Sequence, residues 1–478
     1  MTHERARART LPALCVAAFS AVFALGCSPS PQPSAKSAPP PSPVATASSP
    51  VAPSDALPGE LREASEEVAA ALELVARVRE LEKLADVPGV RLERASIRRE
   101  IDEVLAQDTP EAVVIGNTEL LFAFDLVSDG FELRRALSRL YESELAGFYD
   151  PKRDRMVLAA DLGDDQREIT LYHELVHALQ DQHYDLATAL DWKPELSDVQ
   201  AALQALAEGD ATLAMLDVAR VAAGLPVGGE IPPELLRLES VALQAAPELR
   251  GIPGLILRGI VAPYADGLAF VSEVRRRAGG WHGVDAVWRD RPLSTEHILH
   301  PDKYFAREPV EPVPPIEAPA GFSEAVYRDV FGEQGLRLLF EEWAPASAAA
   351  SAASDWGGDR VAVFVEGDQR LVLLHLVFDN EAAARRAAVL FARGALRPEL
   401  EESPETEPRP FAEAAEAESA LRGGRFCALR KRRGAFAVAL QGRHVGVAVG
   451  PYVRKPDSNG RNGTCAQAST LAERVLRQ

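Results

Sequence analysis

The sequence predicts an α+β fold: a mainly helical first domain with a small edge sheet, followed by a smaller α+β domain. Three observations support this prediction. Apolar residues recur at helical spacing over most of residues 60–278. Prolines crowd together at 309–319, as expected at a domain boundary. Short apolar runs typical of strands begin near residue 360. The length of 478 residues is enough for two or three domains.

The composition excludes several classes of protein. Hydrophobic residues make up 47% of the chain and charged residues 26%, which excludes a disordered or collagen-like chain. The formal net charge of −19 argues against a nucleic-acid-binding protein, which would carry a basic stripe. Only 4 cysteines are present, which excludes a disulfide-dense scaffold and the usual cysteine-rich zinc folds.

The N-terminus has the features of an export signal. Arginines at the start precede an apolar run at 11–25, which is short for a membrane span. Residues 24–27 resemble a bacterial lipobox in which Cys27 is lipidated. We therefore predict a signal peptide over 1–27 and an exported chain that is lipid-anchored at Cys27 in the cell envelope. In a Gram-negative cell the resemblance implies the outer membrane, facing the periplasm. An ordinary cleaved signal and an uncleaved anchor are the alternatives.

The mature chain begins with a segment rich in Ser, Pro and Ala over 28–58, which predicts a flexible tether. The first domain is expected over 59–312. Helical patterns cover 60–105, 119–145, 166–184, 197–222, 232–247 and 265–278. A turn signal at 147–151 and a strand at 155–159 separate the second and third of these helices. The helices at 166–184 and 197–222 begin with capping-box patterns led by Asp165 and Ser197.

The second domain is expected over 320–478. Strands are predicted at 360–365, 370–378, 426–430, 435–440 and 445–449, with helices at 381–393 and 466–477. Gly394 is expected to end the first of these helices. The basic run at 430–433 predicts a hairpin turn, and 399–419 an exposed acidic loop. Cys427 and Cys465 remain outside the signal peptide, and we expect them to pair in an oxidising compartment, with two buried free thiols as the alternative.

One motif carries most of the chemistry. His173, Glu174 and His177 form an HExxH pattern inside the helix predicted over 166–184. Residues four apart share one face of a helix, so both imidazoles can bind one metal ion. Glu174 lies beside them, where a carboxylate can take a proton from an activated water. The alternative is two histidines and a glutamate on a solvated helix face.

A catalytic zinc needs a third protein ligand, and two residues compete for this role. His183 has the spacing of the metzincin pattern, but Gln180 stands where that pattern has glycine, and a continuing helix turns His183 away from His177. Glu208 lies in the next predicted helix, as the third ligand of gluzincin peptidases does. We expect Glu208. Asp210 could orient a histidine by a hydrogen bond, although a regular helix turns it away from Glu208.

The chain resembles a group of secreted bacterial and archaeal proteins of the gluzincin type. The matching stretches are GFYDP, YHELVHALQDQHY, EGDA, PYADGLAFV, GGW, STEHILHPDKY and WGGDR, at 147–151, 172–184, 208–211, 263–271, 279–281, 294–304 and 356–360. The resemblance implies a zincin-like metallopeptidase domain in which His173, His177 and Glu208 bind Zn²⁺. It also implies that Glu174 is the general base.

A peptidase also needs a donor to the oxyanion of the tetrahedral intermediate, which His or Tyr commonly supplies. We expect His300 in this role, with His297, Tyr264 and Tyr304 as alternatives. A structural turn with a satisfied histidine is the competing interpretation of the stretch at 294–304.

Two functions remain open from the sequence. The first is a membrane-tethered zinc metallopeptidase that acts on a peptide or protein substrate. The second is a non-catalytic zinc-binding envelope lipoprotein that serves binding or assembly. The complete set of His173, Glu174 and His177 favours the first, because a decayed site would often lose its glutamate.

Overall fold

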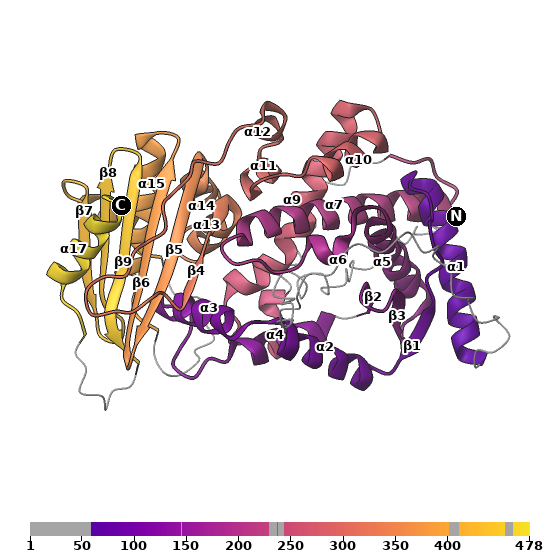
Figure 1. Cartoon of the computed structure of the whole chain (residues 1–478), viewed down its shortest axis with the longest axis horizontal. Coiled ribbons are helices and arrows are strands. Elements are labelled where there is room, and N and C mark those ends of the chain that lie inside the picture. The colour runs from indigo at the N-terminus through magenta and orange to yellow at the C-terminus, as the bar shows by residue number, and fades with distance from the viewer. Residues whose placement is uncertain (1–58, 145, 229–236, 238–242, 401–410, 455–461) are drawn as a thin grey trace, which may run out of the picture.

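The computed structural model describes residues 59–144, 146–228, 237, 243–400, 411–454 and 462–478. Within them the protein is α+β, with a helical part (α1 to α12) beside a six-stranded sheet (Figure 1). The predicted signal peptide, the tether and Cys27 lie outside the described residues.

The helical part begins with α1 (Gly59–Arg79), α2 (Arg94–Asp108), α3 (Glu111–Ala123) and α4 (Leu133–Glu144). The continuous helix expected over 60–105 is wrong, because strand β1 (Gly89–Leu92) interrupts it. Pro88 cannot continue a helix, and Gly89 packs so closely on α1 that an added Cβ would lie 2.5 Å from the Ala64 carbonyl oxygen. The helix predicted over 119–145 is likewise divided between α3 and α4.

A small three-stranded sheet forms from β1, β2 (Gly147–Asp150) and β3 (Arg155–Ala159), in the order β1-β3-β2. Strand β3 is parallel to β1 and antiparallel to β2. The strand prediction for 155–159 is confirmed. The predicted turn at 147–151 is only partly correct, because its first four residues form β2 and the chain turns after Asp150.

Two long helices follow the small sheet, α5 (Asp164–Tyr184) and α7 (Ser197–Ala222), with the short α6 (Leu186–Ala189) between them. Both long helices agree with the predictions, but their capping boxes do not form. The N-cap residues are Gly163 and Leu196, without side-chain caps. Ser197 instead hydrogen-bonds through its backbone N–H and its hydroxyl to Asp329 of the sheet part. A long-range polar contact has therefore replaced the local cap.

Helix α9 (Gly254–Ala278) is longer than the predicted helix at 265–278, because Pro263 is accommodated inside it. Most of the helix predicted at 232–247 lies outside the described residues. In the part of the chain that the structure describes, α9 is the helix whose length and hydropathy would suit a membrane span. However, 67% of its most apolar stretch is buried inside the protein, as expected for a core helix. The short helices η3 (Pro247–Leu249), α10 (Trp281–Arg289), α11 (Thr295–Leu299) and α12 (Pro301–Ala306) complete this part.

Helices α7 and α9 cross in close contact at two glycines, Gly209 and Gly267. A Cβ on Gly209 would lie 2.1 Å from the carbonyl carbon of Gly267, and a Cβ on Gly267 would lie 1.9 Å from the carbonyl oxygen of Ala205. Both glycines lie in stretches that carry the family resemblance. Their role is close backbone packing, which brings α9 up to the segment of α7 that carries Glu208.

Replacing Gly267 with alanine is therefore expected to destabilise the protein by about 1–3 kcal/mol, the usual cost of overpacking a core. The measurement is urea unfolding, compared with Gly259→Ala on the same helix. A Cβ on Gly259 would meet nothing nearer than Leu338, at 4.0 Å, so this variant should match or exceed the parent chain in stability. Equal stability of the two variants would contradict the close crossing.

The sheet part consists of β4 (Tyr327–Asp329), β5 (Trp356–Glu366), β6 (Gln369–Phe378), β7 (Arg425–Arg430), β8 (Gly434–Gln441) and β9 (His444–Val453). All pairings are antiparallel, in the order β4-β5-β6-β9-β8-β7. Five of these strands agree with the predicted strands, and β4 was not predicted. The hairpin expected at 430–433 is confirmed between β7 and β8.

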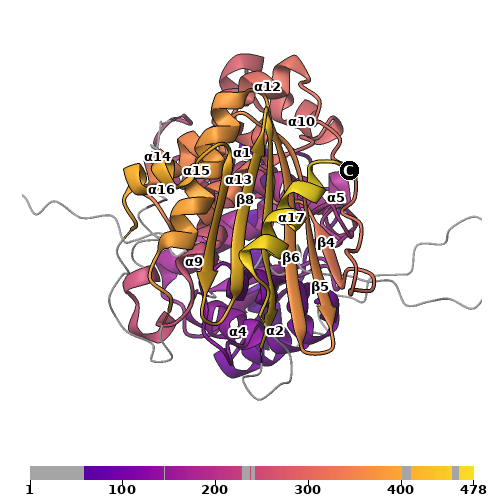
Figure 2. The same ribbon diagram turned by 90° about the vertical axis from the view of Figure 1, so that its left-hand side faces the viewer.

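Helices cover both faces of this sheet. One face packs against α15 (Glu381–Leu396), and the other lies under α17 (Cys465–Val475), which crosses in front of the strands in Figure 2. Alternate residues of β6 therefore enter different cores, Leu374 and Leu376 on one side and Leu371 and Leu373 on the other. Further helices are α13 (Gly332–Phe340), α14 (Ala346–Ala353) and α16 (Ala414–Ala420).

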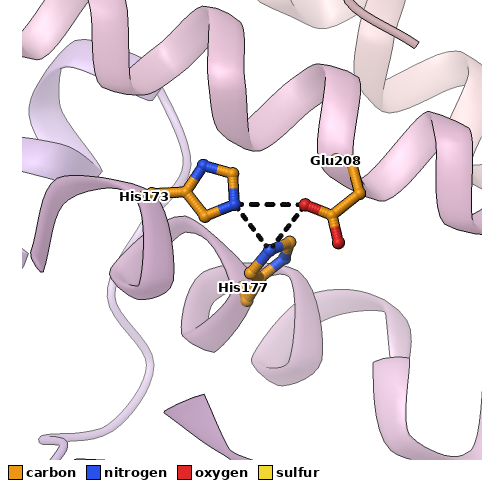
Figure 3. A group of neighbouring side chains, drawn as sticks. All are labelled: His173, His177 and Glu208. Atoms are coloured by element: carbon orange, nitrogen blue, oxygen red, sulfur yellow. Dashed lines mark hydrogen bonds and ion pairs between the residues drawn. The ribbon is translucent and has the colours of Figure 1, made fainter. Parts of the chain in front are cut away.

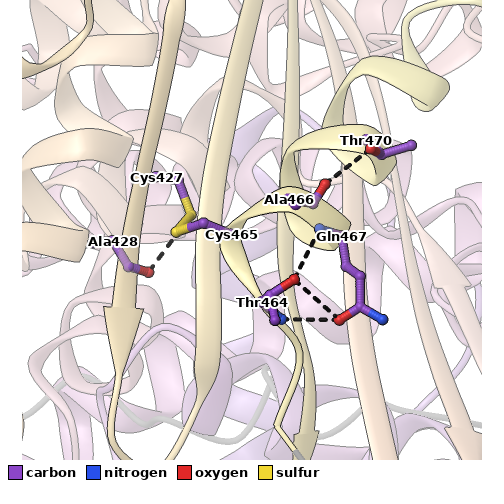
Figure 4. The surroundings of a disulfide bond; sticks show 7 residues. All are labelled: Cys427, Ala428, Thr464, Cys465, Ala466, Gln467 and Thr470. Atoms are coloured by element: carbon purple, nitrogen blue, oxygen red, sulfur yellow. Dashed lines mark hydrogen bonds between the residues drawn. A yellow bond between two sulfur atoms is a disulfide. The ribbon is translucent and has the colours of Figure 1, made fainter.

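The predicted stop at Gly394 is wrong, since α15 continues to Leu396. A Cβ on Gly394 would lie 2.4 Å from the indole of Trp343, so this glycine serves packing. The pairing of Cys427 with Cys465 is confirmed: a disulfide joins β7 to the first residue of α17, with a Cα–Cα distance of 5.8 Å (Figure 4).

The two predicted domains are in close contact across their predicted boundary. Residues that follow α3 pack against the sheet, although they belong to the first predicted domain. Asp125 forms ion pairs with Arg430 (2.8 Å) and Arg433 (2.9 Å), all three buried. Arg433 also donates to the backbone oxygens of Phe122 and Val127. The larger hydrophobic core also contains residues of both parts.

Candidate metal centre

The HExxH motif lies in the buried half of α5. Leu175, Val176, Ala178 and Leu179 have no exposed surface and anchor the helix in the core. His173 and His177 are one helical turn apart and project from the same face toward α7 (Figure 3).

Glu208 of α7 meets both histidines. The distance from His173 Nε2 to Glu208 Oε2 is 3.1 Å, from His177 Nε2 to Glu208 Oε2 3.4 Å, and between the two Nε2 atoms 3.2 Å (Figure 3). The structure thus brings together the three residues that the sequence nominated as metal ligands. All three are buried, Glu208 completely.

The three atoms suit a first-row metal ion such as zinc. Ligand atoms about 2.0–2.1 Å from a tetrahedral ion lie about 3.3 Å from one another. The observed separations of 3.1–3.4 Å agree with this geometry. Two imidazoles and one carboxylate also match the donor set of catalytic zinc sites that leave one position open.

Charges in the group favour an ion pair when no metal is bound. Burial disfavours the charged form of Glu208 and so raises its pKa. The interactions with His177 and His173 have a larger effect in the opposite direction and lower the pKa of Glu208 to about 2. Burial also opposes a charged imidazole at His177, but Glu208 and then Glu174 raise its pKa to about 9. Metal binding must therefore displace a proton from His177.

Glu174 lies beside the three ligands and next to the small sheet. Its Oε2 accepts a hydrogen bond from the backbone N–H of Tyr149 in β2, at 3.1 Å. Its Oε1 is buried without a hydrogen-bond partner among the described residues. Burial raises the pKa of Glu174. One carboxylate oxygen thus accepts a hydrogen bond from β2, and the other is buried beside the three ligand atoms.

His183, the rival third ligand, does not reach the group. His183 lies in the last turn of α5, and its Nε2 is 2.7 Å from the backbone oxygen of Glu82, which follows α1. The argument that an uninterrupted helix turns His183 away from His177 is therefore confirmed. Glycine is absent at position 180, and the helix continues to Tyr184.

His300, expected as the oxyanion donor, lies between α11 and α12 and is bound to Glu333, with 2.8 Å between Nε2 and Oε1. This hydrogen bond raises the pKa of His300. None of its contacts in the described part of the chain reaches the three ligands. Ser294 caps α11 by accepting a hydrogen bond from the His297 N–H.

The three alternative oxyanion donors differ in their distance from the three ligands. His297 lies 2.8 Å from the backbone oxygen of Glu308, and the Tyr304 hydroxyl donates to the backbone oxygen of Asp290. Tyr264 of α9 alone among these candidates adjoins the group, with its ring centroid 5.8 Å from that of His173.

The stretch at 294–304 instead joins the helical part to the sheet part. Three carboxylates, from Glu296, Glu308 and Asp379, converge closely enough to hold a cation. The ammonium group of Lys303 occupies their centre, at 2.6, 2.7 and 2.8 Å from the three residues. These contacts favour the structural interpretation of the stretch.

Gln180 was not among the predicted site residues, yet its Oε1 lies 2.8 Å from His177 Nδ1. The signal was present, because position 180 is one turn after His177 on the same helix. Asp210 was considered as a direct partner of a histidine. It acts one step removed, by accepting a hydrogen bond from Gln180 at 3.2 Å.

The comparisons with known proteins give one match, which lies in the sheet part. A family model described as a domain of unknown function (DUF8575) matches residues 321–458. Searches of curated proteins and of solved structures find no match to the chain. The match covers less than half of the chain and does not include the HExxH helix, so the metal centre has to be interpreted from its own geometry.

Proposed function

We propose that this chain is a zinc-dependent metallopeptidase of the cell envelope, tethered through a lipid anchor at Cys27, that hydrolyses peptide bonds in a peptide or protein substrate. The observation that carries this proposal is the convergence of His173, His177 and Glu208 within 3.4 Å, beside the carboxylate of Glu174. With its glutamate from the following helix, the ligand set is of the gluzincin type, and we infer a zincin-like fold for the helical part.

A bound zinc ion would supply a Lewis acid that polarises the scissile carbonyl and lowers the pKa of the attacking water. Glu174 is then the general base that takes the proton from that water through its free Oε1. It returns the proton to the leaving amine. The Tyr149 N–H holds the other oxygen and orients the carboxylate.

Two neighbouring features fit a peptide substrate. Strand β2 is an edge of the small sheet, and an extended peptide can pair with such an edge through its backbone once the side chains that bury β2 move aside. Tyr264 adjoins His173, so we propose Tyr264, rather than His300, as the donor to the oxyanion. His300 is already engaged by Glu333.

Burial favours the alternative of a non-catalytic zinc site. His173, Glu174 and His177 are 2%, 2% and 4% exposed, and Glu208 is 0% exposed. A substrate can reach the metal only if covering side chains move aside. Structural zinc sites are closed in this way, whereas catalytic sites keep one position open. The two functions therefore differ in whether the ion accepts a fourth ligand from solution.

Zinc content of the purified full-length chain tests the ligand set. We expect about one zinc per chain, as a single centre requires. Glu208→Ala should lose this zinc, whereas His183→Ala should keep it, because His183 is bound to a backbone oxygen away from the centre. Cleavage of a mixed peptide library by the zinc-loaded chain, detected by mass spectrometry, then tests peptidase activity.

The outcomes separate the proposals. Loss of zinc in His183→Ala and retention in Glu208→Ala would show that the third ligand is wrong. Absence of zinc from the parent chain, even after zinc is added, would overturn the metallopeptidase. Bound zinc with no cleavage of any peptide would favour the non-catalytic lipoprotein.

A further inference from the structure

The hydrogen bonds of Gln180 determine which way its amide group faces. Gln180 is completely buried on α5. Its Nε2 donates to the backbone oxygen of Ala207 at 3.0 Å and to Asp210 Oδ2 at 3.2 Å, both on α7. Both partners only accept hydrogen bonds, so the NH₂ group must face α7. Rotating the amide by 180° would place Oε1 against two other oxygens.

This orientation leaves the carbonyl oxygen of Gln180 facing His177. Oε1 lies 2.8 Å from His177 Nδ1, and an amide oxygen can only accept. Nδ1 must therefore carry a hydrogen. In the neutral imidazole, the lone pair then lies on Nε2, the atom that faces His173 and Glu208.

Asp210 is itself held rigidly from two other helices. Arg79 of α1 donates to both of its carboxylate oxygens, at 2.6 and 3.1 Å, and the indole N–H of Trp288 in α10 donates to Oδ2 at 2.9 Å. Arg79 and Asp210 are both 0% exposed. Arg79 Nη2, which donates to Asp210, also donates to Asp285 Oδ1 at 2.8 Å.

We propose that Gln180, oriented by Asp210, is the positioning residue that presets the Nδ1–H tautomer of His177 for metal binding through Nε2. The proposal rests on the zinc site proposed above. The two histidines differ in this respect, because His173 Nδ1 has no hydrogen-bond partner in the part of the chain that the structure describes. Replacing Gln180 should therefore weaken metal binding by changing the orientation and tautomer of His177. Outer partners of ligating histidines commonly contribute about 10–100-fold to metal affinity.

The first test measures zinc affinity of the full-length chain by competition with a chromogenic chelator. Gln180→Leu removes the amide at similar size and should weaken zinc binding by about 10–100-fold. Gln182→Leu is the matched control, because Gln182 lies on the same helix and its hydrogen bonds within the described residues join the backbone of Leu84 and Ala85 instead of His177. It should bind zinc like the parent chain.

The second test needs no substitution. Long-range ¹H–¹⁵N NMR of the histidine side chains in the zinc-loaded parent chain reports which ring nitrogen carries the hydrogen. His177 should show Nδ1–H with the metal on Nε2, and a metal on Nδ1 would overturn the proposal even if Gln180→Leu did not fold.

The outcomes also distinguish this proposal from the one on which it rests. Zinc affinity of Gln180→Leu equal to that of the parent would overturn the positioning role and leave the zinc site intact. A parent chain that binds no zinc would overturn both. Equal weakening in Gln180→Leu and Gln182→Leu would indicate a general loss of structure in α5 and would contradict a specific role.

Discussion

Replacing Glu174 with glutamine is expected to reduce peptide hydrolysis by about 10²–10⁴-fold, the usual contribution of a general base. Glutamine has nearly the same shape and can still accept the hydrogen bond from the Tyr149 N–H. It cannot take a proton from water. Because Glu174 is not one of the three ligands, zinc should remain bound at the parent stoichiometry.

The measurement is a rate of peptide cleavage together with zinc content on the same preparation. Glu168→Gln is the matched control, since Glu168 is exposed on the same helix. It should leave the rate unchanged. Full activity in Glu174→Gln would remove Glu174 from the mechanism, and zinc loss in that variant would mean that its effect cannot be assigned to proton transfer.

Asp125 is expected to make a large contribution to stability at the contact between the two parts of the fold. Its carboxylate is 4% exposed and faces the guanidinium groups of Arg430 and Arg433, which are 6% and 1% exposed. Removing one partner of such a buried group leaves uncompensated charge and typically costs about 3–5 kcal/mol. Asp125→Asn should therefore lower the free energy of unfolding by about this amount.

Asparagine is the suitable replacement because Asp125 has a φ of +60°, which asparagine tolerates better than alanine. The measurement is urea unfolding. Asp129→Asn serves as the control: Asp129 is 45% exposed and lies 3.6 Å or more from Arg432 and Arg454. Exposed pairs contribute about 0–1 kcal/mol, so the control should be close to the parent. Equal losses of stability in the two variants would contradict a stabilising role of the buried ion pairs of Asp125.

Features that depend on local periodicity and composition could be predicted from the amino-acid sequence. Helices α5 and α7, strand β3 and five of the six strands of the large sheet followed from apolar spacing, because each buries a continuous face. The HExxH spacing placed His173 and His177 on one face for the same reason. The pairing of Cys427 with Cys465 followed from their being the two cysteines outside the signal peptide.

Features that depend on contacts between distant segments could not be predicted in this way. The helix caps expected at Asp165 and Ser197 gave way to other N-caps, and Ser197 formed a hydrogen bond to Asp329. Strand β4 is too short for a recognisable pattern and is defined by its pairing with β5. Gly394 looked like a helix stop but packs against Trp343.

The candidate metal centre contains both kinds of feature, some set by local spacing and some by contacts between distant segments. Two of the proposed ligands and the proposed general base lie on one helix, so their spacing alone brought them together. Glu208 could be nominated from its place in the next helix, but only the packing of α5 against α7 set its distance of 3.1 Å from His173. Gln180 and Asp210 reached their roles through hydrogen bonds that cross from helix to helix. Such bonds depend on how the helices pack against one another, because a shift of about 1 Å between them would break the hydrogen bonds.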